Sequence, residues 1–112
     1  MTTTPRIFNQ LKPTNTTQST LLYTVPAGQQ AQLTIIVCNQ AAILENFRIA
    51  IVQAPQNPGN QPDISNYIAY DTQLIGNGIF AISGIGLNSS DQIWIRSQLG
   101  NVSFTATGIQ FS

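Results

Sequence analysis

The chain has 112 residues, a formal net charge of zero, no histidine and one cysteine, and charged side chains make up only 7% of it. Asparagine, glutamine, serine and threonine together exceed a third of the sequence, so we expect a polar but almost uncharged surface. This composition argues against an enzyme, a nucleic-acid-binding protein and a membrane protein, because it supplies few catalytic groups, no basic patch and no long apolar stretch. Zero net charge instead favours self-association, since no long-range repulsion keeps copies apart.

The length predicts one compact domain, and the N-terminal residues predict an arm ahead of it. Residues 1–19 are polar and rich in threonine around a short apolar patch at Ile7, Phe8 and Leu11. We expect an extended arm with one short strand, followed by a β-sandwich domain over 20–112. The arm shows no basic segment followed by an apolar one, so no secretory signal is predicted and folding in a cytoplasm is expected.

Alternating apolar and polar residues predict β-strands along the chain. Leu33, Ile35 and Val37 fall on one face of an extended segment, and the same period of two recurs around Phe47 and Phe104. β-branched residues dominate these runs and no long window shows helical spacing, so the fold class is all-β. We expect a single β-sandwich or jelly-roll-like domain of about eight short antiparallel strands. The predicted strands are 5–10, 20–25, 31–39, 46–53, 66–74, 79–84, 91–98 and 102–111.

Two dipeptides predict tight connections between strands. Asn77-Gly78 is the strongest short signal for a β-hairpin, because both residues tolerate positive φ. Gly100-Asn101 predicts a second hairpin, between the strand that contains Trp94 and the last strand.

Residues 54–65 do not fit the regular pattern of strands and short turns. Pro55, Pro58 and Pro62 keep this segment out of a sheet interior, and it exceeds the usual loop length of ~4–6 residues. Loops of this length are typically functional or disordered, so this proline loop is a candidate contact element.

Among the aromatic residues, Tyr67 and Trp94 are candidate contact residues. Simple alternation places Tyr67 and Tyr70 on opposite faces of one strand, so at least one of them should point outward. If Ile93 and Ile95 are core residues, Trp94 lies on the outer face of its strand. It is then either an exposed interface anchor or covered by another strand, the arm or the proline loop of the same chain.

The few ionisable residues predict neither a catalytic nor a metal site. A Ser-Lys pair would depend on Lys12, the only lysine, in the predicted arm. Calcium at Asp63 would be held by one carboxylate per loop, which balances the charge of the ion poorly. Cys38 lies in a predicted buried strand and is interpreted as a small hydrophobe. No catalytic residue, metal ligand or cofactor is predicted. The carboxylates are separated in sequence and are expected in turns or in solvent; they are Glu45, Asp63, Asp71 and Asp91.

Several strand and turn segments together resemble a group of small virion structural proteins of tailed bacteriophages, notably those that infect cyanobacteria. The resemblance spans roughly residues 5–111. It implies a compact β-sandwich that decorates the head or contributes to the tail, with no catalytic residues to carry over. The segments that carry it are Leu22-Tyr23-Thr24-Val25-Pro26-Ala27-Gly28, Ile35-Ile36-Val37-Cys38-Asn39, Tyr67-Ile68-Ala69-Tyr70-Asp71, Val102-Ser103-Phe104 and Gly108.

These observations lead to two hypotheses. The first is a non-enzymatic capsid decoration, or cement, protein on the virion surface, made in the cytoplasm of a bacterial host. Its partners would be the major capsid protein and neighbouring copies of itself, with a homo-oligomer on the particle and no nucleic acid or membrane. The alternative is a receptor- or glycan-binding module at the tail tip or fibre. The candidate partner-binding residues are Arg6, Ile7, Phe8, Leu11, Pro55, Pro58, Pro62, Tyr67 and Trp94.

Overall fold

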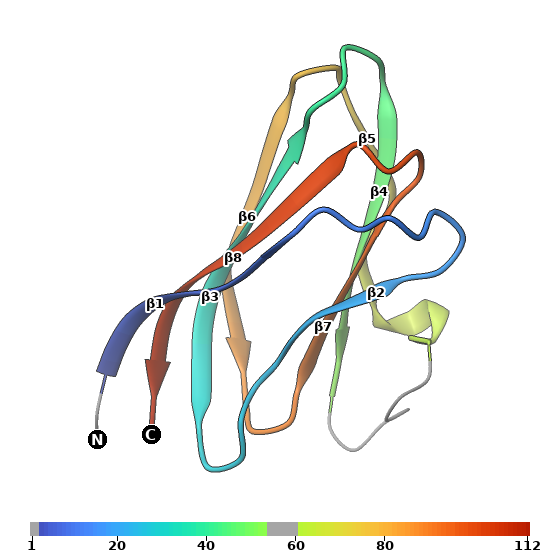
Figure 1. Cartoon of the computed structure of the whole chain (residues 1–112). Coiled ribbons are helices and arrows are strands. Elements are labelled where there is room, and N and C mark those ends of the chain that lie inside the picture. The colour runs from blue at the N-terminus through green and yellow to red at the C-terminus, as the bar shows by residue number, and fades with distance from the viewer. Residues whose placement is uncertain (1–2, 54–60) are drawn as a thin grey trace.

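The computed structural model describes residues 3–53 and 61–112, which fold into two four-stranded sheets packed face to face (Figure 1). The first sheet has the strand order β1-β8-β3-β6 and the second the order β2-β7-β4-β5, with antiparallel neighbours throughout. The predicted all-β sandwich is confirmed. The elements are β1 Thr3–Leu11, β2 Thr20–Thr24, β3 Gln30–Asn39, β4 Glu45–Val52, the 3-10 helix η1 Ile64–Asn66, β5 Tyr67–Leu74, β6 Ile79–Leu87, β7 Gln92–Ser97 and β8 Val102–Phe111.

The core lies between the sheets and contains the residues that the alternation selected. Ile35 and Val37 of β3 are fully buried, and Phe104 of β8 lies on the same face of the first sheet. The Phe47 ring of β4 packs across from the second sheet, with ring centroids 6.2 Å from Phe104 and 5.4 Å from Phe80. Burial of one face of each strand is the main force that holds the two sheets together.

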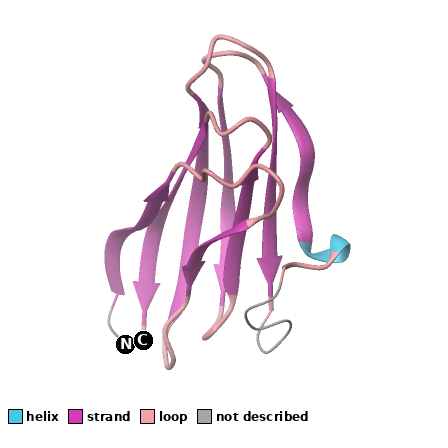
Figure 2. Cartoon of the chain, turned by 45° about the vertical axis from the view of Figure 1, so that its right-hand side comes forward, coloured by secondary structure: helices cyan, strands magenta, loops and turns pink. Residues whose placement is uncertain are grey.

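The predicted arm is extended, but residues 3–11 belong to the sandwich. β1 pairs with β8 from Thr3 opposite Phe111 to Leu11 opposite Phe104. Phe8 is only 7% exposed, because its ring packs into the core against the ring of Tyr23 at a centroid distance of 4.9 Å. The start of β1 therefore lies beside the end of β8 (Figure 2).

Both predicted hairpins turn out to be connections between the two sheets. The turn at Asn77 has the expected positive φ of 58°, and Gly100 has a φ of 83°. However, β5 and β7 belong to the second sheet, whereas β6 and β8 belong to the first. Among the described strands, β4 and β5 are the only consecutive pair that is hydrogen-bonded side by side. The turn residues allow the chain to reverse direction. Whether the next strand pairs in the same sheet or in the other one depends on which side chains it must bury in the core.

Strand β6 is longer than predicted, because it continues through a bulge. The register of β6 against β3 shifts between the pairs Leu33 with Ile85 and Ile35 with Ile82. Gly84 lies in this shift with a φ of 77°, a conformation that glycine adopts without steric cost.

Candidate interaction surfaces

The outer face of the first sheet carries no charged side chain, and we call it the uncharged face. Its residues alternate with the buried residues of β3 and β8 and continue onto β6 and β1 through the strand pairing. Isoleucines protrude from a background of threonine and serine, with Ile79 71% exposed and Ile7 58% exposed. The neighbouring Arg6 turns away from this face, with its guanidinium carbon 5.2 Å from the centre of the Phe8 ring. The residues of the uncharged face include Ile7, Gln32, Thr34, Ile36, Cys38, Ile79, Ala81, Ser83, Ser103, Thr105, Thr107 and Ile109.

One end of the sandwich is also apolar and uncharged. It is built from the turns 40–44, 75–78 and 98–101, which meet in the upper part of Figure 1. The amide of Asn77 donates to the carbonyl of Ala41 at 2.8 Å, and the amide of Gln40 donates to the carbonyl of Asn101 at 2.9 Å. Four large aliphatic side chains protrude from these turns, each more than half exposed, and we call this region the apolar end. They are Ile43, Leu44, Ile75 and Leu99.

A buried asparagine fixes two of the three turns of the apolar end. Asn39 is fully buried, and its Nδ2 lies 2.8 Å from the carbonyl oxygen of Ile43, 3.1 Å from that of Leu74 and 3.2 Å from that of Ile75. Its Oδ1 accepts a hydrogen bond from the amide of Ala41 at 3.0 Å. The side chain thus ties the β3–β4 turn to the β5–β6 turn, and a buried polar group with its bonds satisfied holds one conformation.

A buried glutamate fixes the third turn. Glu45 is 1% exposed, although the sequence predicted a solvated or turn-forming carboxylate. Its Oε2 accepts hydrogen bonds from the hydroxyl of Ser97 and from the backbone amides of Leu99, at 3.1 Å, and Asn101, at 3.3 Å. The Ser97 hydroxyl oxygen in turn accepts from the amide of Gly100 at 3.0 Å. The turns of the apolar end are therefore held by buried hydrogen bonds, and their exposed side chains are hydrophobic.

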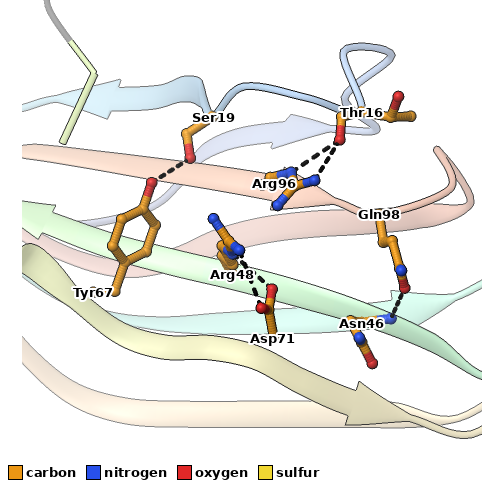
Figure 3. A network of polar contacts seen from close by, with 8 residues as sticks. All are labelled: Thr16, Ser19, Asn46, Arg48, Tyr67, Asp71, Arg96 and Gln98. Carbon is orange, nitrogen blue, oxygen red and sulfur yellow. Dashed lines mark hydrogen bonds and ion pairs between the residues drawn. The ribbon is translucent and has the colours of Figure 1, made fainter. Parts of the chain in front are cut away.

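The outer face of the second sheet is different, and we call it the covered face. Arg48 of β4 forms a bidentate ion pair with Asp71 of β5, with nitrogen–oxygen distances of 2.7 and 3.0 Å (Figure 3). This hydrogen-bonded pairing lowers the pKa of Asp71 and raises the pKa of Arg48. The Arg48 guanidinium carbon lies 3.9 Å from the centre of the Tyr70 ring and 5.8 Å from that of Tyr67, so cation–π contacts add to the pair.

Both tyrosines face Arg48, so the prediction of opposite faces is wrong. Strand pairing places Ile49 opposite Ala69 but Ala50 opposite Tyr67, so β5 contains extra residues relative to β4. A second irregularity lies between Phe47 and Ile49, where Asp71 adopts a φ of 50°. These bulges reset the alternation and bring the two rings to the same side, 5.3 Å apart in an edge-to-face arrangement.

The segment between β1 and β2 lies against the covered face. The Nε and Nη2 atoms of Arg96 on β7 donate to the carbonyl oxygen of Thr16 at 2.9 and 2.7 Å (Figure 3). The hydroxyl groups of Ser19 and Tyr67 lie 2.7 Å apart, and the amide of Ser19 donates to Oε1 of Gln61 at 2.8 Å. The charged and aromatic side chains of this face thus hold another part of the same chain.

Trp94 is covered within the chain. It is 8% exposed and clusters with Ala50, Val52 and Tyr67 on the covered face. Its indole nitrogen donates to Oε1 of Gln92 at 3.0 Å. Of the two interpretations that the sequence left open, the structure therefore supports cover by the same chain.

The structure does not bring the predicted contact residues together. On β1, Arg6 and Ile7 are exposed, whereas Phe8 is buried and Leu11 is half-buried. Pro62 is half-buried, like Tyr67, and Pro55 and Pro58 lie outside the described residues. Ile7 belongs to the uncharged face, while Tyr67 and Trp94 belong to the opposite side of the sandwich. Phe8 and Trp94 contribute to packing within the chain.

Sequence reasoning missed most residues of the uncharged face and the apolar end. The uncharged face could have been predicted from alternation. Ile36 and Ile109 occupy the outward positions of strands whose inward positions were correctly predicted as core. No comparable signal marked the apolar end, since its three turns are far apart in sequence and meet only in the folded chain.

Comparison with family models, with curated proteins and with solved structures gives no match to this chain. Within residues 3–53 and 61–112, no three histidine, cysteine, aspartate or glutamate side chains gather into a group that could hold a metal ion. The same residues contain no helix with the length and apolar character needed to cross a membrane.

Proposed function

We propose that this chain is a non-enzymatic virion structural protein that decorates the outer surface of an assembled phage head and strengthens the joints between capsomers. The observation that carries the proposal is the uncharged face, a broad sheet surface with exposed isoleucines and no ionised group. Such a surface can be buried against a partner without removing ions from water, which is the main penalty of polar interfaces.

The distribution of charge supports decoration of a repeating lattice. A protein displayed in many copies at close spacing multiplies any net charge into repulsion between neighbours. This chain has a formal net charge of zero, and Arg48 and Asp71 already neutralise each other on the covered face. Repulsion between adjacent copies is therefore small.

The apolar end supports the same proposal as a second contact. Asn39 and Glu45 fix its turns from within, so Ile43, Ile75 and Leu99 are presented without a loop that must become ordered on binding. Such preorganisation lowers the entropy cost of association.

The experiment measures binding of purified chain to heads of the phage that encodes it. We expect Ile36→Lys, which charges the uncharged face, and Ile43→Lys, which charges the apolar end, each to reduce the number of copies bound per head by about tenfold, equivalent to ~1.4 kcal/mol. Ile64→Lys is the matched control, because Ile64 is exposed in η1 and belongs to neither surface. Equal binding of all three variants, or no binding of the unmodified chain, would contradict the proposal.

A second candidate function is glycan binding at the tail tip or fibre, and one observation favours it. Tyr70 is 47% exposed beside the Arg48 and Asp71 pair, which provides an aromatic ring next to hydrogen-bonding groups. A glycan array whose signal is lost in Tyr70→Ala and kept in Ile36→Lys would support this candidate. Labelled protein found only at the tail in micrographs would exclude head decoration.

A further inference from the structure

The four edge strands of the sandwich differ in how they are protected against pairing with other chains. An unprotected edge exposes a row of unpaired backbone groups, and proline, charge, bulges and short length all prevent its use. Strand β1 contains Pro5 and Arg6 and a register shift between Ile7 and Asn9. These features make β1 a poor template for another strand.

The two edges of the second sheet are also protected. Strand β2 has only five residues, and the carbonyl of its Leu22 accepts a hydrogen bond from Nδ2 of Asn9 at 2.7 Å. Strand β5 carries Asp71 at positive φ and is interrupted by bulges.

Strand β6 lacks these protections over its first half. It has nine residues, Ile79–Leu87, with neither a charged residue nor a proline. Its bulge at Gly84 comes after Ile82 and leaves residues 79–82 in regular register with β3. Phe80 and Ile82 point toward the second sheet and pack at the margin of the core, but both remain half-buried. The core is therefore incompletely closed along this edge.

We propose that two copies of this chain pair antiparallel through β6, so that their first sheets join into one continuous sheet. Residues directly opposite each other in such a pair must lie on the same face. A twofold axis at Ala81 satisfies this condition, because it sets Ala81 against its own copy and Phe80 against Ile82 of the other copy. Pairing of an aromatic with a β-branched side chain is favourable across strands, and here it would cover the open margin of the core.

The absence of charge on β6 favours a second copy as the occupant. A twofold axis brings every residue near it close to its own counterpart, so any charged residue there would meet a like charge. Strand β6 has none, and the whole chain is formally neutral. The protected β1 edge meanwhile disfavours head-to-tail pairing of β6 with β1, which would produce an open polymer.

This inference goes beyond the proposed function, because it concerns contact between copies and needs no phage head. The paired sheets would present two uncharged faces side by side as one larger surface. The two proposals can therefore fail separately. A chain that stays monomeric can still bind heads, and a chain that does not bind heads can still dimerise.

The first test measures the molar mass of the full chain by sedimentation equilibrium over a range of concentrations. We expect a dimer of twice 12.1 kDa for the unmodified chain. Ala81→Lys should weaken dimerisation at least about tenfold, equivalent to ~1.4 kcal/mol, because two lysines would face each other at the axis. The control Ala27→Lys introduces the same residue at an exposed turn and should remain dimeric, and circular dichroism checks that both variants are folded.

The second test uses a disulfide cross-link to establish whether the two copies of residue 81 lie opposite each other. Residues directly opposite each other across antiparallel strands have Cα atoms roughly 4.5–5.5 Å apart, which lies within the range for a disulfide bond. In a Cys38→Ser background, Ala81→Cys should form a covalent dimer under mild oxidation, whereas Ala27→Cys should not. A monomeric unmodified chain, an Ala81→Lys variant that dimerises normally, an open polymer, or equal cross-linking of both cysteine variants would overturn the proposal.

Discussion

The two outer faces of the sandwich use their side chains in opposite ways. On the covered face, Arg48 binds Asp71 and Arg96 binds the carbonyl of Thr16, so the charged groups form contacts within the chain. Within residues 3–53 and 61–112, the uncharged face carries isoleucines, threonines and serines and no charged side chain. The few charged groups of this sequence are therefore unevenly distributed: several hold contacts within the chain, and among the described residues none lies on the outer face of the first sheet.

The largest expected effect is on the covered face. Trp94→Ala should lower the free energy of unfolding by about 3 kcal/mol, because truncation of a buried aromatic leaves a cavity beside Ala50 and Val52. Ile7→Ala on the uncharged face should change it by about 0.5 kcal/mol or less, because that side chain is already exposed. Urea unfolding measures both values. Similar losses for the two variants would mean that the faces do not differ as described.

The apolar end should depend on its buried carboxylate. Glu45→Gln is expected to destabilise the fold by about 2 kcal/mol, because an amide group replaces the carboxyl group whose Oε2 accepts hydrogen bonds from Ser97 and two backbone amides. Hydrogen exchange should accelerate at the amides of Leu99 and Asn101 in particular. Unchanged exchange at these two positions would show that Glu45 does not hold the turn.

A smaller effect is expected at the contact between β7 and the segment before β2. Arg96→Gln removes the charged donor to Thr16 and should cost about 1.5 kcal/mol of stability. Exchange at residues 14–19 should rise with it. Arg6→Gln is the matched control, and because Arg6 is exposed on an edge strand, its effect should be about 0.5 kcal/mol or less. Equal effects of the two substitutions would argue against an anchoring role for Arg96.

The smallest effect is expected at the Arg48 and Asp71 pair, whose carboxylate side chain is 46% exposed. Solvent screening limits such a pair to less than about 1 kcal/mol. Because Arg48 lowers the pKa of Asp71 in the folded state, the stabilisation is present above the unfolded pKa of about 3.9 and is lost as the pH falls through the folded value. Asp71→Asn tolerates the same positive φ and should show a shallower loss of stability on acidification. Identical acid profiles, measured by urea unfolding, would contradict this contribution.

The sequence was sufficient to predict the strands, because each buries one face and the period of two is visible locally. Six predicted strands match the observed bounds to within one residue at each end. The sheet topology was not predictable in the same way. Asn77 and Gly100 each have a positive φ, but a positive φ at one turn residue does not determine whether the chain pairs back within a sheet or crosses to the other one.

The candidate surfaces depended on features that alternation cannot represent. Two bulges in β5 place Tyr67 and Tyr70 on the same side of the sheet. The alternation of apolar and polar residues does not show where a bulge occurs, so it could not predict this placement. Glu45 and Asn39 are buried because backbone amides and carbonyls from distant turns converge on them. These partners come together only in the tertiary structure, so the local sequence around each residue suggested a solvated group or an ordinary strand end.

The pairing of β1 with β8 also constrains the order of folding. Thr3 lies opposite Phe111, so β1 cannot pair until β8 has been synthesised, and β8 also occupies the place between β1 and β3. Sheets closed by such distant segments form slowly, because the entropy of a long loop is lost before any contact compensates for it. A chain that lacks β8, Val102–Phe111, would expose the unpaired sides of both β1 and β3, so the first sheet can form only once β8 is present.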